Sequence, residues 1–477
     1  MKQSIGKSRT DTHRLLPVFT LLIFCSYAVL AGLPDLCFHV PEMVGLTALI
    51  TILLMGVAVC TPRAQTDWAA WRLLGPAALF RLMFVFKAPT LSDDIYRYVL
   101  DGLMALSGHN PYALTPAGAA EAFPRWAELI ANVNHPGFFT IYPPSAQIVF
   151  AVGALLGGVF GMKLLLSILD IATCFMLIRL LDRIGRPRKL VVLYAWHPLP
   201  VLEIAGSGHI DAAGICLVFA TILLVLRLTD APSATAGSDK TAGVSTIRSP
   251  QPVYAAAAGL TAAAAVLVKL FPIFFMPGFL PGITPAGRRW FIAGAMISGV
   301  LLTWPFVPDI FNAGQSLSAY LNTWEFSGFL FRSVRSISGS DPAARMIVTG
   351  AFIAITAALY VKLLVLFPRL RDGNTALRHI LETFYGISFA YMLTTPTLHP
   401  WYALYLVAFI PFAGGPAGIV FSWSVLLSYQ VLQHYALTNQ WIEHDITALM
   451  IVSAPAAAVA VQWGSLIFRT FTRKASP

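Results

Sequence analysis

The charged residues best suited to chemistry lie in one short segment, Ser92–Gly102, which reads Ser-Asp-Asp-Ile-Tyr-Arg-Tyr-Val-Leu-Asp-Gly. Its charges are Asp93, Asp94, Arg97 and Asp101, in a chain of which only 11% of the residues are charged. A carboxylate can accept a proton from an attacking hydroxyl, and a cation can stabilise an anionic leaving group. The segment therefore has the residue types that a group-transfer site needs.

A helix would place four of these side chains together. Asp94, Arg97, Tyr98 and Asp101 are spaced i, i+3, i+4 and i+7, so they share one face if the segment is helical. The run Ser-Gly-His-Asn-Pro-Tyr at 107–112 contains the glycine and the proline that end such a helix. A purely structural explanation is also open, because acidic residues in a first helical turn interact favourably with the helix dipole.

Composition indicates the class of protein that positions this segment. The chain has 477 residues, of which 57% are hydrophobic, and a mean hydropathy of +0.72. Apolar runs at 15–31, 44–60, 291–307, 346–367 and 446–461 approach or reach the length of about 20 residues that crosses a bilayer. We predict an all-α, polytopic integral membrane protein with one membrane domain over residues 1–477 and roughly 12–14 transmembrane helices.

The distribution of basic residues predicts the orientation in the membrane. Lysine and arginine crowd both termini and the short loops near 63–72, 183–189 and 369–378, which is typical of cytoplasmic segments. The segment 90–141 contains only two basic side chains, Arg97 and Arg125. We therefore expect cytoplasmic termini and an extracytoplasmic 90–141 loop. The net charge of +10 reflects this asymmetry, and no nucleic-acid partner is predicted.

The remaining organisation follows from the same reasoning. A loop as long as 90–141 should contain short helices, and residues 143–181 fit one full span plus one shorter piece. Residues 229–252, rich in Ser, Ala, Gly and Thr, predict a flexible cytoplasmic linker. Further spans are predicted near 190–206, 208–228, 253–268, 290–307, 346–367, 379–395, 400–413, 416–432 and 446–467, with a proline-broken segment at 270–284.

Other polar residues map to the same membrane face as the 92–102 segment. They are Tyr142, His209, Asp211, Lys269, His399, Trp401 and Tyr402. Each has an alternative explanation: Lys269 can snorkel to the interface, the 206–211 turn can cap a helix, and the 398–402 turn can join an aromatic belt. Together they place carboxylates and cations at one membrane depth.

That combination suits glycosyl transfer from a lipid phosphate. A carboxylate takes the proton of the acceptor hydroxyl, while cations neutralise the phosphate that leaves. The chain has no Gly-rich phosphate-binding loop, which argues against a nucleotide-sugar donor. Its five cysteines have no C-x-x-C spacing, and we predict no cofactor and no metal ligands.

The motifs also resemble those of a known family. Ser92–Gly102 followed by Asn110-Pro111-Tyr112 resembles the first-loop signature of bacterial polyprenol-phosphate-mannose-dependent alpha-mannosyltransferases, members of the GT-C superfamily. Further similar motifs follow in the same order: Ile141–Pro144, His197-Pro198, Gly208–Asp211, Val268–Pro272 and His399–Tyr402. The resemblance implies a GT-C-like bundle in the bacterial inner membrane, an inverting enzyme, and an active site that faces the periplasm.

The resemblance also assigns roles. It implies that an aspartate at the start of the first large outer loop is the catalytic base, which here is Asp94, with Asp93 as the alternative. We expect Arg97, Lys269 and His399 to bind the donor phosphate. The expected substrate-binding residues are Tyr98, Asp101, Tyr142, His209, Asp211, Trp401 and Tyr402. The partners are a polyprenyl-phosphate-linked sugar, a lipid-linked or surface glycan acceptor, and membrane lipids.

Several alternatives stay open at this stage. The chain has histidine at 197 and 209 where the family pattern often has asparagine, and phenylalanine at 271 where it has tyrosine, so the sugar is mannose, another hexose or a pentose. A lipid-carrier-dependent polysaccharide polymerase or ligase is a second possibility. It would be expected to have a larger outer loop, rich in arginine and histidine, late in the chain, and the outer loop 309–341 contains Arg332 and Arg335. A transporter is less favoured, because it would show paired repeats and ionisable residues at mid-bilayer depth.

Overall fold

The computed structural model describes residues 4–60, 69–229, 251–369 and 372–474. The described residues are mostly helical, and they contain no strand apart from two isolated bridges that join Phe326 and Ser327 to Thr397. The predicted all-α, polytopic architecture is therefore confirmed.

Seven helices of the described part are long and apolar enough to cross a membrane. They are α2 (Val40–Cys60), α8 (Gly158–Arg183), α11 (Asp211–Thr229), α12 (Gln251–Val268), α14 (Pro285–Thr303), α17 (Asp341–Leu366) and α22 (Asp445–Lys474). Shorter apolar helices occupy 17–32, 144–155, 271–282 and 400–413. Helices α14 and α17 leave most of their apolar side chains exposed, as expected of helices that face lipid. The total of 12–14 crossings stays a prediction.

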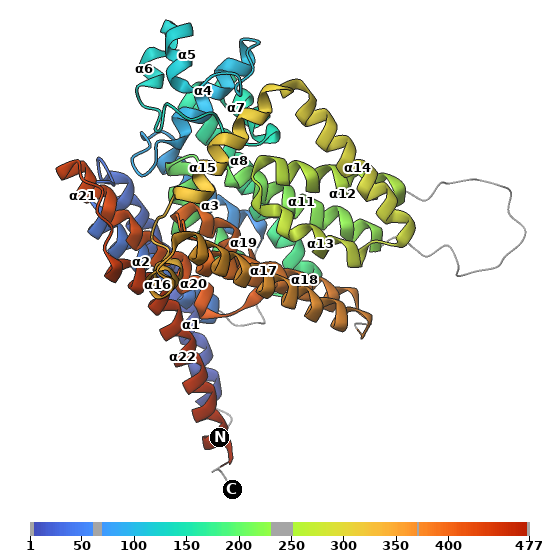
Figure 1. Ribbon diagram of the computed structural model, residues 1–477. Coiled ribbons are helices and arrows are strands. Elements are labelled where there is room, and N and C mark those ends of the chain that lie inside the picture. Colours follow the sequence, from blue (N-terminus) through green and yellow to red (C-terminus); the bar gives the residue numbers. More distant parts are fainter. Residues whose placement is uncertain (1–3, 61–68, 230–250, 370–371, 475–477) are drawn as a thin grey trace, which may run out of the picture.

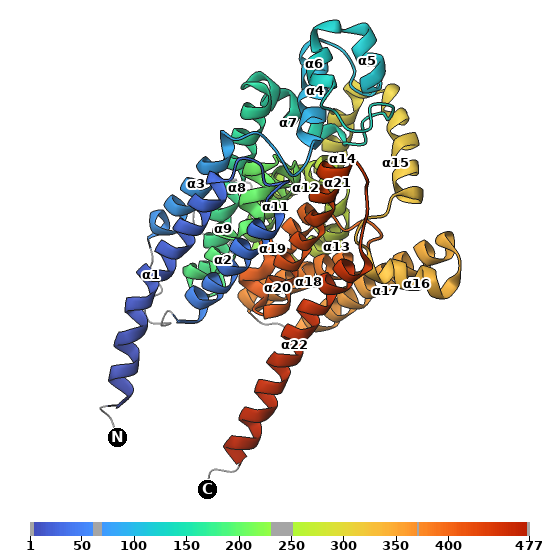
Figure 2. The same ribbon diagram turned by 90° about the vertical axis from the view of Figure 1, so that its left-hand side faces the viewer.

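The first three helices carry the chain to one end of the bundle. Helix α1 (Ser4–Gly32) packs against α2 and α3 (Ala70–Val85). Figures 1 and 2 show the terminal ends of α1 and α22 at the bottom of the molecule and the 94–130 helices at the top. We call this top region the upper end; it is opposite the two termini.

Short helices form the 90–141 segment, as predicted. They are α4 (Asp94–Leu106), α5 (Pro116–Ala122), the 3-10 turn η1 (Pro124–Trp126) and α6 (Ala127–Ile130). A small separate core of Leu100, Met104, Ala119, Ile130 and Val133 holds them together. Helix α4 also packs on α7 (Pro144–Leu155), and a Cβ added at Gly102 would lie 2.2 Å from the carbonyl oxygen of Phe150. Glycine at 102 therefore permits the close approach that anchors α4 to the bundle.

The region after α4 agrees with one prediction and corrects another. Residues 144–183 form the 12-residue α7 and the 26-residue α8, which matches one full span plus a shorter piece. Residues 190–206, predicted as one span, are instead a chain of short turns: η2 (Arg188–Val191), α9 (Val192–Ala195), α10 (Pro198–Pro200) and the π-helical η3 (Val201–Gly206). Pro198 and Pro200 cannot donate backbone hydrogen bonds, so a continuous helix is interrupted there.

The remaining elements complete the bundle. Helices α11, α12 and α14 pack together, and α12 and α14 touch through small residues such as Gly259 and Gly294. The predicted 229–252 linker falls almost entirely on 230–250, outside the described residues, while its end residues belong to α11 and α12. The other elements are η4 (Phe271–Phe275), α13 (Met276–Phe279), η5 (Leu280–Gly282), η6 (Trp304–Phe306), η7 (Asp309–Phe311), α15 (Asn312–Thr323), α16 (Phe329–Ser338), η8 (Phe367–Arg369), α18 (Gly373–Thr394), η9 (Pro400–Tyr402), α19 (Ala403–Ala413), α20 (Pro416–Ser424), η10 (Val425–Tyr429) and α21 (Gln430–Thr438).

Candidate active site

Asp94 lies at the first position of α4, where its carboxylate accepts hydrogen bonds from two side chains and lies near a third. Oδ1 accepts a hydrogen bond from Asn134 Nδ2 at 3.2 Å, and Oδ2 accepts one from the Tyr142 hydroxyl at 3.2 Å. His209 Nδ1 lies 3.9 Å from Oδ2, and the Asp94 side chain stays 21% exposed. The two hydrogen bonds thus fix the orientation of the carboxylate, and the Asp94 side chain remains partly accessible.

Asp93, the alternative base, has different surroundings. It precedes the helix as the N-cap residue without a capping bond from its side chain, whereas Ser92 Oγ accepts a hydrogen bond from the Asp94 amide at 3.3 Å. Partial burial and the neighbouring Asp94 charge raise the pKa of Asp93. Asp94, rather than Asp93, therefore makes the side-chain contacts that join α4 to the rest of the site.

Arg97 and Asp101 brace the back of the same helix. Arg97 Nε lies 2.9 Å from Asp101 Oδ1, and Arg97 Nη1 donates to the Phe138 carbonyl at 3.0 Å. Gln147 Nε2 donates to Asp101 Oδ2 at 3.3 Å. Tyr98, on the same helix, is also buried. These contacts fix the 134–142 segment, which supplies both hydrogen-bond partners of Asp94.

The aromatic rings of Tyr98 and Tyr142 pack against each other beside Asp94. Tyr98 stacks on Phe150 with ring centroids 4.4 Å apart and meets Tyr142 edge-on at 4.8 Å. Tyr98 is 1% exposed, whereas Tyr142 is only partly buried. Tyr98 therefore positions Tyr142, and Tyr142 is the ring that reaches the open side of the site.

Lys269 provides a cation in the same region. Its Nζ lies 2.7 Å from both carboxylate oxygens of Asp211, the first residue of α11, and 4.7 Å from the ring centre of Tyr402. The Asp211 carboxylate is 1% exposed, whereas the Lys269 side chain is 22% exposed. The Tyr402 hydroxyl is hydrogen-bonded to that of Tyr320. The ion pair with Asp211 thus fixes the ammonium, while part of the Lys269 side chain remains exposed.

A column of stacked rings connects the late part of the chain to this cluster. Phe326 stacks on His399 at 4.8 Å, His399 on Trp401 at 4.3 Å, and Trp401 on His209 at 4.0 Å. Burial and then the charge of Lys269 lower the pKa of His399 to about 3, so this ring is neutral at physiological pH. The column ends at His209, next to Asp94.

Gly208 explains how His209 reaches that position. Its φ is +78°, a conformation that glycine adopts without steric cost. A Cβ at Gly208 would lie 2.3 Å from Ile95 Cδ1, so the turn is pressed directly against the first turn of α4. The absence of a side chain at Gly208 therefore sets the separation between His209 and Asp94.

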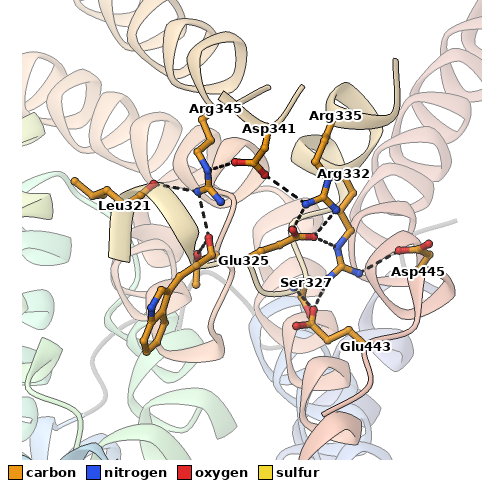
Figure 3. A network of polar contacts seen from close by, with 11 residues as sticks. Leu321, Glu325, Ser327, Arg332, Arg335, Asp341, Arg345, Glu443 and Asp445 are labelled. Carbon is orange, nitrogen blue, oxygen red and sulfur yellow. Dashed lines mark hydrogen bonds and ion pairs between the residues drawn. The ribbon is translucent and has the colours of Figure 1, made fainter. Parts of the chain in front are cut away.

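An ion-pair network supports the far end of the ring column (Figure 3). Arg332 forms ion pairs with Glu325 at 2.7 Å, with Asp445 at 3.1 Å and with Glu443. Glu443 also accepts a hydrogen bond from the Ser327 amide at 2.8 Å. Around it lies an open hollow of about 640 Å³. Arg335, Asp341 and Arg345 extend the network. The network holds the 325–328 segment, which carries Phe326.

The pairing in this network bears on the polymerase or ligase alternative. That alternative is supported by the presence of Arg332 and Arg335 in the outer loop 309–341. In the structure each guanidinium is paired with carboxylates, and the pairs fix a loop. The network is therefore explained by its structural role.

Most of the predicted site residues do converge. Asp94, Tyr142, His209, Asp211, Lys269, His399, Trp401 and Tyr402 form one connected cluster, while Arg97, Tyr98 and Asp101 lie behind α4 as supports. The sequence interpretation missed Asn134 and the fully buried Glu203. Glu203 had a detectable signal, because it is a lone acid within an apolar stretch that reads as a membrane span.

The fold and the cluster define a class, that of helical membrane proteins with a polar cluster at one end of the bundle. Residues 30–281, more than half of the chain, match the family described as alpha-(1->6)-mannopyranosyltransferase, N-terminal domain. The chain therefore belongs to this family and is a GT-C-like mannosyltransferase. No curated protein and no solved structure matched the chain. The matched region includes Asp94, His209 and Lys269 and ends before His399.

Proposed function

We propose that this protein transfers mannose, or another hexose, from a polyprenyl-phosphate donor to an acceptor hydroxyl, with inversion at the anomeric carbon. Membership of the mannosyltransferase family supports the sugar transfer. The observation that carries the proposal is the open carboxylate of Asp94, which Asn134 and Tyr142 orient in a cluster that also contains the cation of Lys269.

Asp94 acts as the base in this scheme. The acceptor hydroxyl gives its proton to the carboxylate as its oxygen bonds to the anomeric carbon, and the bond to the phosphate oxygen breaks on the opposite face. The hydrogen bonds from Asn134 and Tyr142 hold the carboxylate in one orientation, so little reorganisation is needed in the transition state. Asp93, the preceding residue, is the alternative base; its side chain makes neither of these hydrogen bonds.

Lys269 neutralises the phosphate that leaves. Lys269 is paired with Asp211, as Arg97 is with Asp101, but the Lys269 side chain is 22% exposed and that of Arg97 only 8%, so Lys269 is the better placed of the two to meet a donor phosphate. His399 contributes a neutral ring beside it. Arg97 acts through its bonds to Asp101 and Phe138, which hold the wall of the site, and would reach the donor only by exchanging these partners.

The polar and aromatic residues around these two groups form the sugar-binding walls. Tyr142, Trp401 and Tyr402 are partly exposed rings suited to the apolar face of a sugar, while His209 and Asp211 line the interior. We propose that the upper end faces the periplasm across the inner membrane, which the basic loops of the sequence support. The acceptor is then a lipid-linked or surface glycan.

A reconstituted assay tests the function. The purified full-length protein in lipid nanodiscs is given synthetic polyprenyl-phosphate-mannose or a mannose nucleotide, with a mannoside acceptor in both cases. We expect the protein to consume the lipid donor but not the nucleotide sugar, and to form a product linkage with inverted configuration. Use of the nucleotide sugar in place of the lipid donor would contradict the proposal.

A further inference from the structure

Glu203 is a buried acid that the scheme above does not use. Its side chain is 0% exposed, and it lies in the π-helical segment Val201–Gly206. Acidic side chains are almost never fully buried unless they are paired. The Tyr429 hydroxyl lies 2.8 Å and 2.9 Å from its two oxygens, and His209 Nε2 lies 3.4 Å from Oε2. No cation is paired with Glu203 in the described part of the chain.

His209 lies between this acid and the proposed base. Its Nδ1 is 3.9 Å from Asp94 Oδ2, and its Nε2 is 3.4 Å from Glu203 Oε2. Both ring nitrogens are buried and neither has a hydrogen-bond partner. Unsatisfied buried polar atoms are rare in folded proteins, so a ring with two of them calls for an explanation. The two separations reach hydrogen-bond length after shifts of about 1 Å or less.

The surroundings favour a neutral ring. Trp401 covers one face of the imidazole, and Lys269 and His399 are the other ionisable groups directed toward it. Burial, and then the charge of Lys269, lower the pKa of His209. A neutral imidazole has one N–H donor and one acceptor nitrogen, so it can accept a proton at one side and release another at the opposite side.

We propose that His209 and Glu203 form a proton relay that receives the acceptor's proton from Asp94. The inference rests on the proposed function and adds two positioning residues to it. Its basis is the arrangement Asp94–His209–Glu203, in which one unpartnered ring separates an open carboxylate from a buried one.

The step balances without a further reactant. The acceptor oxygen bonds to the anomeric carbon, the electron pair of the broken bond leaves with the phosphate, and the acceptor's proton moves to Asp94 Oδ2. In molecules in which Glu203 is ionised, that proton then passes to His209 Nδ1 while the Nε2 proton passes to Glu203 Oε2. Burial raises the pKa of Glu203 to about 8, so the ionised fraction grows as the pH rises toward 8, and once protonated Glu203 retains the proton. Asp94 is a carboxylate again, the ring is neutral in its other tautomer, and Glu203 holds the proton. Reversal after product release returns it through Asp94 to water.

The test compares Glu203→Gln with Glu203→Asp in nanodisc-reconstituted full-length protein, using synthetic polyprenyl-phosphate-mannose. Gln preserves the shape and a hydrogen bond to Tyr429 but cannot take the proton, whereas Asp still can. We expect Glu203→Gln to lower the single-turnover rate about 10–100-fold, with unchanged donor Kd, and Glu203→Asp to recover much of that loss. The solvent deuterium isotope effect should fall in Glu203→Gln.

A double variant separates a relay from a structural role. Members of one relay fail together, so Glu203→Gln combined with His209→Gln should be no slower than either single variant. Additive losses, or a normal rate and isotope effect in Glu203→Gln, would overturn the relay. If Glu203→Gln fails to fold, His209→Gln and Glu203→Asp carry the same comparison. Wild-type protein that does not consume the lipid donor would instead contradict the proposed function.

Discussion

Trp401 and His209 stack with ring centroids 4.0 Å apart and their planes 19° from parallel. His209 lies within the family-matched region 30–281, whereas Trp401 lies in the later part of the chain. The cluster around Asp94 is therefore completed by residues outside that region. The ring column from Phe326 to His209 connects the two parts, together with the Lys269–Tyr402 contact and the hydrogen bonds from Tyr429 to Glu203.

This connection predicts the effect of removing Trp401. Trp401→Ala takes away the surface that holds both His209 and His399, and stacked aromatic pairs are worth about 0.5–1.5 kcal/mol beyond the area that they bury. We expect turnover with polyprenyl-phosphate-mannose to fall about 10-fold or more in folded protein. Trp290→Ala is the matched control, because Trp290 is 51% exposed on α14. Equal activity of the two variants would show that the column is dispensable.

Lys269 predicts a change in donor binding. Lys269→Gln keeps a polar side chain beside Asp211 but removes the charge that would meet the lipid phosphate. Charge-assisted contacts are worth about 1.5–3 kcal/mol, so the donor Kd should rise about 10–150-fold. Lys362→Gln, at an exposed position on α17, should leave Kd unchanged. A Kd within twofold of wild type in Lys269→Gln would leave Lys269 with a structural role only.

Gly208 predicts a specific steric effect. Gly208→Ala would place a methyl group 2.3 Å from Ile95 Cδ1 at a φ of +78°, so the Ile95 side chain or the turn must shift and the backbone of the turn is strained. We expect a lower melting temperature and a lower rate, because His209 would separate from Asp94. Gly350→Ala is the control: an added Cβ there meets nothing within 4 Å in the middle of a helix. Unchanged stability and rate in Gly208→Ala would contradict this account of the turn.

The orientation is tested by labelling. In a variant without the five native cysteines, a cysteine introduced at Ser107 should react with a membrane-impermeant maleimide added to intact spheroplasts. A cysteine at Ser238, outside the described residues, should react only after the membrane is opened. The reverse pattern would place the upper end in the cytoplasm and exclude a periplasmic site.

Local sequence signals were sufficient for α4 and its charged face. The i, i+3, i+4 and i+7 spacing from Asp94 to Asp101 and the stop near Ser107 depend only on neighbouring residues, and the structure has that helix at 94–106. The roles of Arg97 and Asp101 were harder to assign, because the pair turns inward to meet Phe138 and Gln147, and these contacts are set by tertiary packing.

The span predicted at 190–206 is wrong for a related reason. Hydropathy measures apolar content, which is high there, but Pro198 and Pro200 divide the stretch into short buried turns. Those turns place Glu203 next to His209. The ring column was equally hidden from the sequence, because Phe326, His399, Trp401 and His209 come from three distant segments.

The most direct test of the central claim is the turnover of Asp94→Asn. Asparagine keeps the shape of the side chain and most of its hydrogen bonds, but it cannot take the proton of the acceptor. We expect turnover with polyprenyl-phosphate-mannose to fall about 10²–10⁴-fold, with donor Kd and melting temperature close to wild type, and a smaller loss in Asp93→Asn. Near-normal turnover in folded Asp94→Asn would contradict the assignment of Asp94 as the base.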